Sequence, residues 1–399
     1  MRIACTGDWH MFAYTDFSKT YMVRWNKETM RYERELSEDA VENAYCKPMN
    51  SRLFNVLNGI CDMRDYCFEN HIHNMLVAGD IFHKRETIDV SVYNPTYRVL
   101  ETFEPKKIKV YAIAGNHDQI DNSQQPLSSL HPLKEIINVI EKPEILSLYD
   151  YEEPDDPYEG DDSEYVVALP FSKDKQFVLD SMTELRAKLD SPRDAILLCH
   201  LGITGGLVGS GQYSMKDEYG LKELMYDKWK YLVAGHYHQP QLLEYNSIYT
   251  GSPLQNNFGD ELKGEDGYNG FFVIDTEKRW DIRFVPIIAP RFITLTADEL
   301  DGVNPDIFNE HYVRIKSTAQ DSDKVKDLLE KSVDMADANV RLELEKEYVT
   351  EHRSDIGVSN TFEETVDIYA TEKYSGEQEL SKIKEMGLTI LREATVGGE

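Results

Sequence analysis

The chain has 399 residues, of which 41% are hydrophobic and 29% are charged, and its formal net charge is −29. This length and composition are typical of a globular protein with a large core and about two domains. The negative net charge excludes a protein that coats nucleic acid, because phosphate binding needs clustered Lys and Arg. A nuclease is compatible with this charge, since bound cations and local basic islands can contact the phosphates.

We expect no membrane span and no secretory signal, because Arg2 and Ile3 lead directly into an apolar strand and no long apolar run follows. The five cysteines are scattered and lack Cys-x-x-Cys spacing, a pattern typical of reduced thiols rather than of a disulfide framework or a zinc ribbon. These features predict a cytoplasmic protein.

Five short apolar segments each end in a polar motif. The segments are Ile3–Cys5, Met75–Ala78, Val110–Ala114, Ala195–Cys199 and Tyr231–Ala234. The motifs that follow them are Gly7–His10, Gly79–His83, Gly115–Asp118, His200 and Gly235–His238. One Gly-Asn turn by itself is an ordinary loop signal, but the parallel strands of an α/β sheet bring their carboxyl ends to one edge. We therefore expect the five motifs to form a single site.

The motifs combine carboxylate, amide and imidazole groups, and they contain six of the eleven histidines. This set suits manganese, iron or zinc better than magnesium or calcium, and it is too large for one tetrahedral ion. A two-metal centre, in which a carboxylate bridges ions that activate water for attack on phosphorus, is the economical interpretation. In an extended chain, the side chains of residues two apart point to the same side. We therefore expect Asp8 and His10 to face one metal together, and likewise His236 and His238.

Residues 11–50 contain a predicted hairpin, formed by Tyr21–Trp25 and Met30–Tyr32. A basic island lies on it, interleaved with aromatic residues, and consists of Lys19, Arg24, Lys27, Arg31 and Arg34. Two interpretations stay open. The hairpin is either solvated and neutralised by its acidic neighbours, or it emerges beside the metals and binds DNA through Arg24, Lys27 and Arg31.

Periodicity and helix breakers predict further elements before residue 290. These are a helix over Ser51–Glu69, a helix boundary at Asn94–Pro95, a helix around Pro132–Ile140, a strand near Glu144–Tyr149 and a strand over Tyr165–Leu169. Asp150–Glu164 is expected to be a solvated acidic loop, because it lacks the spacing of a calcium loop. Gly202–Gly211 lacks the Lys-Ser or Lys-Thr of a P-loop, so we expect no ATP hydrolysis.

The pattern changes beyond Pro290. Strands over Phe292–Leu295, Tyr312–Lys316 and Val340–Tyr348 and a helix over Lys324–Met335 predict a small α+β domain. Glu351–Asn360 is a polar linker, and Ser375–Gln378 has the pattern of a capping box that opens a last helix. That helix carries an apolar stripe of Leu380, Ile383, Met386 and Ile390, which either belongs to a core or contacts a partner.

The five motifs, in their order, resemble those of the calcineurin-like metallophosphoesterases. Two further features narrow the resemblance. His83 stands three residues after Asp80, and residues 249–264 contain Thr250-Gly251-Ser252-Pro253 followed by Phe258-Gly259-Asp260-Glu261. Together these features are similar to the SbcD family, the nuclease subunit of the SbcCD DNA repair complex and a relative of other phage, archaeal and eukaryotic double-strand-break nucleases. The match covers about residues 1–290.

The resemblance implies an α/β fold, a two-sheet α/β/β/α sandwich with helices outside. It implies a nuclease domain over residues 1–290, a small α+β DNA-capping domain over 291–350, and C-terminal helices over 361–399 that bind an SbcC-like ATPase. It also implies a homodimer, which the family forms through helices in the region where Pro95 stands here. Pro95 and the long insertion after His10 depart from the family pattern.

The resemblance assigns one metal to Asp8, His10, Asp80 and His238, and the other to Asp80, Asn116, His200 and His236, with His117 and His83 as catalytic residues. The implied cofactors are two Mn²⁺ ions, for which Fe, Zn or Mg are alternatives. The implied function is a manganese-dependent DNA exonuclease and endonuclease in DNA repair, recombination or replication. Two alternatives stay open: a calcineurin-like phosphatase or cyclic-nucleotide phosphodiesterase, and a metal-stabilised scaffold for an ATPase.

Overall fold

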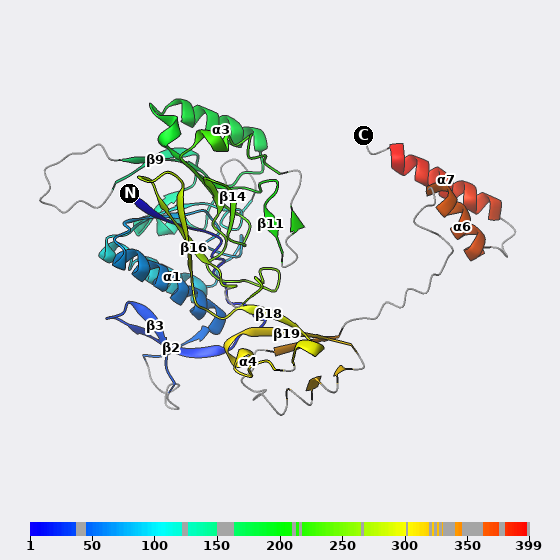
Figure 1. Cartoon of the computed structure of the whole chain (residues 1–399), viewed down its shortest axis with the longest axis horizontal. Coiled ribbons are helices and arrows are strands. Elements are labelled where there is room, and N and C mark those ends of the chain that lie inside the picture. Colours follow the sequence, from blue (N-terminus) through cyan, green and yellow to red (C-terminus); the bar gives the residue numbers. More distant parts are fainter. Residues whose placement is uncertain are drawn as a thin grey trace, which may run out of the picture. The chain divides into compact units, whose positions relative to one another are not determined.

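The structure is a computed structural model that divides into two compact units, Met1–Leu344 and Glu345–Glu399. Among the residues it describes, the first unit holds all the strands and the second holds two helices (Figure 1). The described residues are 1–36, 45–121, 127–149, 163–209, 213–214, 218–264, 267–300, 302–318, 321–322, 325–326, 329, 340–344, 362–374 and 380–396.

Two six-stranded sheets form the centre of the first unit (Figure 1). The first contains, in spatial order, β17 (Asp281–Pro286), β16 (Gly270–Asp275), β1 (Arg2–Thr6), β5 (Asn74–Val77), β6 (Lys109–Ile113) and β7 (Asn138–Ile140). The second contains β14 (Gln241–Glu244), β15 (Ser247–Tyr249), β13 (Tyr231–Gly235), β10 (Ile196–His200), β9 (Glu164–Leu169) and β8 (Glu144–Leu148). The strands β1, β5, β6 and β7 run parallel, as do β9, β10, β13 and β15.

The two sheets pack face to face and bury alternate side chains between them. Ile3 and Cys5 share this inner core with Ile196 and Leu198, whereas Ala4 points to the opposite face of its sheet. Helices α1 (Ser51–Glu69) and α2 (Val90–Leu100) cover the outer face of the first sheet, and α3 (Lys175–Ala187) covers that of the second. The predicted α/β/β/α sandwich is therefore confirmed, and α1 has the predicted bounds.

Two predictions of local structure are wrong. Pro132–Ile140 is not a helix: a short 3₁₀ turn, His131–Glu135, precedes β7, which pairs in parallel with β6 at the edge of the sheet. Pro95 neither starts nor breaks a helix, because it lies inside α2. It is the sixth residue of that helix, so its missing N–H removes only one hydrogen bond at the end of the first turn.

Three strands between α1 and the first motif form an antiparallel sheet that packs on α1. Its strands are β2 (Thr20–Asn26), β3 (Arg31–Arg34) and β4 (Lys47–Asn50), in the order β3-β2-β4. The predicted hairpin is confirmed as the β2–β3 pair. A second short pair is formed by β11 (Leu207–Val208) and β12 (Tyr213–Ser214). Within the described ranges, the other 3₁₀ turns span Glu104–Lys106, Pro192–Asp194, Tyr226–Lys228 and Ala297–Leu300.

A small subdomain, the cap, follows residue 290 within the first unit. Its parallel strands are β18 (Phe292–Thr296), β19 (Tyr312–Ser317) and β20 (Val340–Leu344), and helix α4 spans Ile307–Glu310. Two of the three predicted strands are confirmed, and the third is confirmed as far as Leu344. Most of the helix predicted over Lys324–Met335 lies outside the described residues. Side chains from the sandwich hold the cap: Gln255 accepts a hydrogen bond from the Phe292 N–H and Glu261 accepts one from the Thr294 hydroxyl.

The second unit contains α6 (Phe362–Tyr374) and α7 (Leu380–Val396), which pack against each other. Lys384 pairs with Asp367 at 2.7 Å, and a Cβ at Gly387 would lie 2.8 Å from Val366, so the two helices approach closely there. Met386 stays 63% exposed. The predicted linker and capping box, like most of the acidic loop after Asp150, lie outside the described residues.

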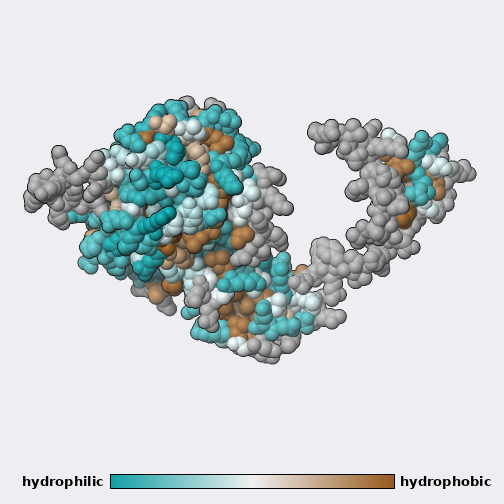
Figure 2. Space-filling model, turned by 45° about the horizontal axis from the view of Figure 1, so that its top comes forward, coloured by the Kyte–Doolittle hydropathy of each residue, from teal (hydrophilic) through white to brown (hydrophobic). Residues whose placement is uncertain are grey.

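Most of the visible face of the first unit is hydrophilic, as the net charge of −29 leads one to expect (Figure 2). Among the helices that the structure describes, none combines the length and apolarity needed to cross a membrane.

Candidate metal centre

The five predicted motifs meet at one edge of the sandwich, as expected from the parallel strands. Strands β1, β5 and β6 of the first sheet are followed by Asp8, Asp80 and Asn116. In the second sheet, β10 ends at His200, and β13 is followed by His236 and His238. Contacts cross between the sheets: the His236 N–H donates to both Asp8 carboxylate oxygens, at 3.1 and 3.0 Å. The site is thus built by both sheets together.

The backbone of the motifs is not extended, which corrects one premise of the sequence analysis. Asp8, His10, Asp80 and His236 have φ angles of 51°, 46°, 55° and 112°. Non-glycine residues adopt such angles at a cost, and they gather where tertiary contacts hold them in a functional geometry. Asp8 and His10 therefore reach the same place through left-handed turns rather than through the alternation of a strand.

Asp8, His10 and His238 form the first group of candidate ligands. One ligand atom from each lies within 4.8 Å of the others, and the Nε2 atoms of His10 and His238 are 3.0 Å apart. The Nδ1 atom of His238 faces the Asp260 carboxylate at 3.1 Å. A carboxylate that accepts Nδ1–H fixes the tautomer of the ring and leaves Nε2 for a metal.

Asp80, Asn116, His200 and His236 form the second group. The Nε2 atom of His200 lies 3.4 Å from Asp80 Oδ2 and 2.9 Å from Asn116 Oδ1, and His236 Nδ1 lies 3.0 Å from the same amide oxygen. His200 donates Nδ1–H to the Ala78 carbonyl at 2.7 Å, which directs its Nε2 into the site. Asp80 Oδ2 is also 3.8 Å from His10 Nε2, so this carboxylate lies between the two groups.

Residues 1–240 match the model of a family described as calcineurin-like phosphoesterase. The chain belongs to this family. It is therefore a metal-dependent phosphoester hydrolase of a dimetal-binding family, which confirms the coarser part of the resemblance. Among solved structures, a dimetal phosphatase from Danio rerio matches with a TM-score of 0.35 and 10% identity, covering 68% of this chain and 91% of that chain. No curated protein matches the chain.

The charges of the phosphoesterase site fit divalent cations. Burial raises the pKa of Asp8 to about 6. Burial alone would lower the pKa values of His200 and His238, but Asp80 raises the first to about 9 and Asp260 raises the second to about 9. Without a metal, His200 and His238 therefore hold protons near neutral pH, and these are the charges that a metal displaces when it binds deprotonated ligands. Fully buried carboxylates facing imidazoles are the donor set that manganese, iron and zinc accept.

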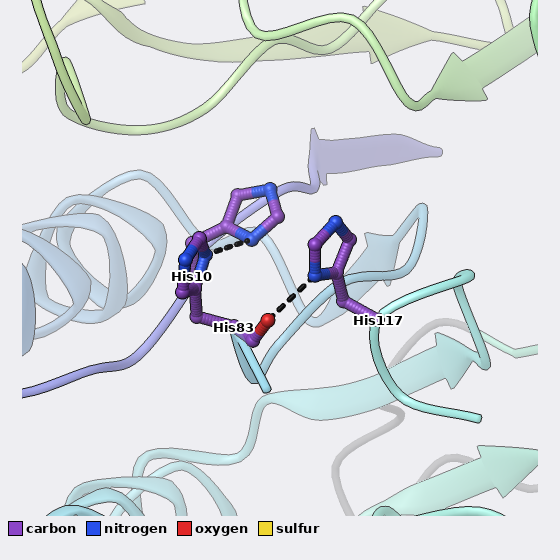
Figure 3. Close-up of side chains that lie close together, drawn as sticks. All are labelled: His10, His83 and His117. Atoms are coloured by element: carbon purple, nitrogen blue, oxygen red, sulfur yellow. Dashed lines mark hydrogen bonds between the residues drawn. The ribbon is translucent and has the colours of Figure 1, made fainter. Parts of the chain in front are cut away.

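His83 and His117 lie beside the first group and are linked to it through His10 (Figure 3). The Nδ1–H group of His117 donates to the His83 carbonyl, and the two rings stack with centroids 5.4 Å apart. His83 Nδ1 lies 3.2 Å from His10 Nδ1. Burial and the neighbouring His117 lower the pKa of His83 to about 4, so His83 is neutral near neutral pH and can accept a hydrogen bond from His10. His117 keeps Nε2 for another partner.

Sequence reasoning gave no role to two carboxylates that support the site. Asp260 contacts His238 and also accepts from the Asn256 N–H at 2.9 Å. Asp118 is buried and accepts from the N–H groups of Phe82 and Gly115, both at 3.0 Å, so it joins the second and third motifs. The Gly-Asn-His-Asp run contained the signal for Asp118, but nothing in the pattern around Asp260 indicates its contact with a histidine 22 residues earlier.

Arg52 connects the first motif to the cap. Its buried guanidinium stacks 3.8 Å from the centre of the Tyr14 ring and also lies over the Phe292 and Tyr312 rings of the cap. The Tyr14 hydroxyl in turn donates to the His10 carbonyl at 3.2 Å. A displacement of the cap would therefore reach His10 through packed side chains.

Two cavities adjoin the candidate metal centre. The proximal cavity, of about 370 Å³, is lined by Met11, Phe12, Phe82 and Lys84, the sequence neighbours of His10 and His83. The distal cavity, of about 610 Å³, is lined directly by Asn116 and His236 of the second group. The distal cavity thus lies beside the second group, and the proximal cavity lies beside His83, whose ring is 5.1 Å from the Phe12 ring.

The predicted DNA-binding residues of the hairpin are largely paired. Arg24 contacts Glu33 at 3.1 Å, and Arg31 contacts Asp62 and Asp65 of α1 at 3.0 and 2.6 Å. Arg31 therefore holds the hairpin on α1 in this structure, whereas Lys27 is exposed at the tip. DNA binding by these residues stays a prediction.

Changing Arg24, Lys27 and Arg31 together to alanine should weaken DNA affinity and lower the slope of log affinity against log salt. The reason is that each lost phosphate contact removes about 0.9 of a released counterion. A matched variant loses three exposed cations elsewhere, Lys188, Arg193 and Lys222, and should keep the parent slope. Fluorescence anisotropy over a salt series measures both. Equal slopes for the two triple variants would leave the hairpin as a solvated element.

Proposed function

We propose that this phosphoesterase is a manganese-dependent DNA exonuclease and endonuclease, the nuclease subunit of an SbcCD-like complex in DNA repair, recombination or replication. The observation that carries the proposal is that one cavity is lined by Asn116 and His236 and that another lies beside His83, where the Phe12 and His83 rings are 5.1 Å apart. A phosphodiester has a substituent on each side of its phosphorus, and a recess on each side accommodates both. A phosphate monoester needs only one.

We assign two metal ions to the groups described above. The first would be held by Asp8, His10, Asp80 and His238, the second by Asp80, Asn116, His200 and His236, with Asp80 shared. When bound, the two ions supply an activated water and stabilise the charge that develops on the phosphate oxygens. Asp260 and the Ala78 carbonyl orient His238 and His200 for this task by fixing their tautomers.

The chain itself supplies the proton for the leaving oxygen. His117 is anchored through Nδ1–H to the His83 carbonyl, so its Nε2 is the atom that can carry a transferable proton. The leaving 3′ oxygen gains negative charge as its bond to phosphorus breaks, and a proton from His117 neutralises it. His83 is neutral and contacts His10 Nδ1, so in this scheme it orients His10 and His117 around the scissile phosphate.

The partner that we propose is an SbcC-like ATPase bound by the C-terminal helices. Helix α7 keeps Met386 exposed on its apolar stripe, and an amphipathic helix that lies in a partner's groove buries such residues. The phosphoesterase sequence has no P-loop, so an ATP-driven complex needs the ATPase from another chain.

Deleting residues from 361 onward should abolish complex formation with the ATPase while leaving manganese-dependent cleavage unchanged, because the deleted helices belong to a separate compact unit. A pull-down with an SbcC-like ATPase measures the first effect, and a nuclease assay measures the second. The point change Met386→Glu should weaken the pull-down, whereas Glu385→Ala, on the exposed polar side, should not. If the ATPase still binds the truncated chain, the helices are not its docking site.

The proposed function is tested with end-labelled duplex and single-stranded DNA in the presence of Mn²⁺. We expect shortening from an end and internal cleavage, both abolished by a chelator. The controls are p-nitrophenyl phosphate, a monoester, and bis(p-nitrophenyl) phosphate, a small diester. Hydrolysis of the monoester without DNA cleavage would favour a phosphatase, and no hydrolysis of any substrate with both metals bound would favour a scaffold.

A further inference from the structure

The distal cavity differs in charge from the rest of this acidic chain. Three cationic side chains line it, those of Arg85, Lys173 and Lys175, together with one carboxylate, Glu218. The chain as a whole has 72 acidic and 43 basic residues, so this excess of cations is a local reversal. Cations grouped in a recess beside a hydrolytic centre attract phosphate groups.

Lys173 lies at the amino end of α3, where it lines the cavity together with Lys175, the first residue of the helix. The Asp174 carboxylate caps this helix by accepting the Phe177 N–H, so the positive charge comes from the lysine side chains and not from the helix end. Lys175 pairs with Glu223 at 2.9 Å. Lys173 is exposed and makes no ion pair with any residue that the structure describes. It is therefore the cation best placed to contact a bound phosphate.

The cavity also has an aromatic wall next to the metal centre. Phe171 is half-buried, lies nearly parallel to the His236 ring at 25°, and has its centroid 6.4 Å from that ring. Its backbone N–H donates to the Ala114 carbonyl at 2.9 Å and its carbonyl accepts from Gln119 at 3.0 Å, which fixes its position. A fixed aromatic ring between a hydrolytic centre and a cationic recess is the combination that stacks a nucleobase.

We propose that the distal cavity binds the nucleotide adjacent to the scissile phosphate, with its base against Phe171 and its next phosphate on Lys173. This inference rests on the proposed nuclease function and adds a subsite to it. A small diester carries neither a second phosphate for Lys173 nor a nucleobase for Phe171. The cavity should thus affect the binding of oligonucleotides and leave small diesters unaffected.

The test compares Lys173→Ala with Lys188→Ala, which removes an exposed lysine at the other end of the same helix. With an oligonucleotide and Mn²⁺, Lys173→Ala should raise KM several-fold and lower the salt slope of log(kcat/KM) by about 0.7. Turnover of bis(p-nitrophenyl) phosphate should stay within about twofold of the parent. Lys188→Ala should change neither reaction.

A second variant tests the aromatic wall. Phe171→Leu keeps the apolar volume but removes the ring, and it should raise KM about tenfold for an oligonucleotide. With a substrate that lacks the base at the adjacent position, Phe171→Leu and the parent should have the same KM. Turnover of bis(p-nitrophenyl) phosphate again reports whether the metal centre beside Phe171 is intact.

The outcomes separate the subsite from the nuclease function. If the parent cleaves DNA and both variants have the parent KM and salt slope, the subsite is wrong and the nuclease function stands. If either variant loses activity on the small diester and on the oligonucleotide to the same extent, the residue serves the metal centre and the subsite is again wrong. A parent that hydrolyses the small diester but no oligonucleotide overturns both.

Discussion

Replacing Asp80 by alanine should remove metal binding and hydrolysis together. Asp80 lies between the two ligand groups, with Oδ2 3.4 Å from His200 Nε2 and 3.8 Å from His10 Nε2. Burial alone would raise the pKa of Asp80, but His200 and His10 hold it well below its ordinary value, so the buried carboxylate is charged and available. Without it, neither group keeps its shared anionic ligand, and two cations would face each other with nothing between them.

Elemental analysis after dialysis, beside the rate on DNA and on bis(p-nitrophenyl) phosphate, measures this result. We expect Asp80→Ala to lose both ions and all activity on both substrates. Asp227→Ala, which removes an exposed carboxylate paired only with Lys228 among the described residues, should keep the metal content and rate of the parent. An Asp80→Ala protein that retains both ions would show that Asp80 does not bridge them.

Replacing His117 by alanine should leave both metals in place and remove nearly all cleavage. His117 belongs to neither ligand group in our assignment, and its Nδ1–H is held by the His83 carbonyl. Losing a general acid typically lowers a rate by about 10²–10⁴-fold. The loss should shrink with a substrate whose leaving group needs no proton, such as bis(p-nitrophenyl) phosphate. That difference distinguishes proton transfer from a loss of loop structure.

Metal content and the rates on DNA and on bis(p-nitrophenyl) phosphate are measured for His117→Ala, with His131→Ala as the control. His131 is exposed, pairs with Glu141 and lies outside the five motifs. His117→Ala should bind DNA with the parent affinity. Its profile of cleavage rate against pH should lack the limb that a general acid produces. If it loses its metals, or cleaves DNA within a few-fold of the parent, His117 is not the proton donor.

The sandwich could be predicted from the sequence because each central strand is a short apolar run followed at once by polar residues. Parallel strands of that kind can end only at one edge, so the meeting of Asp8, Asp80, Asn116, His200 and His236 followed from topology. The way in which they meet did not follow. Left-handed φ angles at Asp8, His10 and Asp80 depend on contacts between the two sheets, such as the His236 N–H on Asp8, which no local pattern contains.

The two wrong predictions of local structure, at Pro132–Ile140 and at Pro95, also arise from contacts that a local pattern does not contain. Leu133, Ile136, Ile137 and Ile140 have helical spacing, yet the unpaired edge of β6 recruits Asn138–Ile140 as a strand. Pro95 lies inside α2, which begins one turn earlier, where the Asp89 side chain accepts the Ser91 N–H. In both cases the prediction considered a residue's own preference without the contact that decides where the element begins or pairs.

The most direct test of the account is the position of the metals. Crystals of the full chain, soaked in Mn²⁺ and measured at the manganese absorption edge, should give two anomalous peaks that both contact Asp80. One peak should also contact Asp8, His10 and His238, and the other Asn116, His200 and His236. A single peak, or a peak enclosed by His10, His83 and His117, which also cluster closely enough to hold an ion, would contradict the assignment of the ligands and the role given to His117.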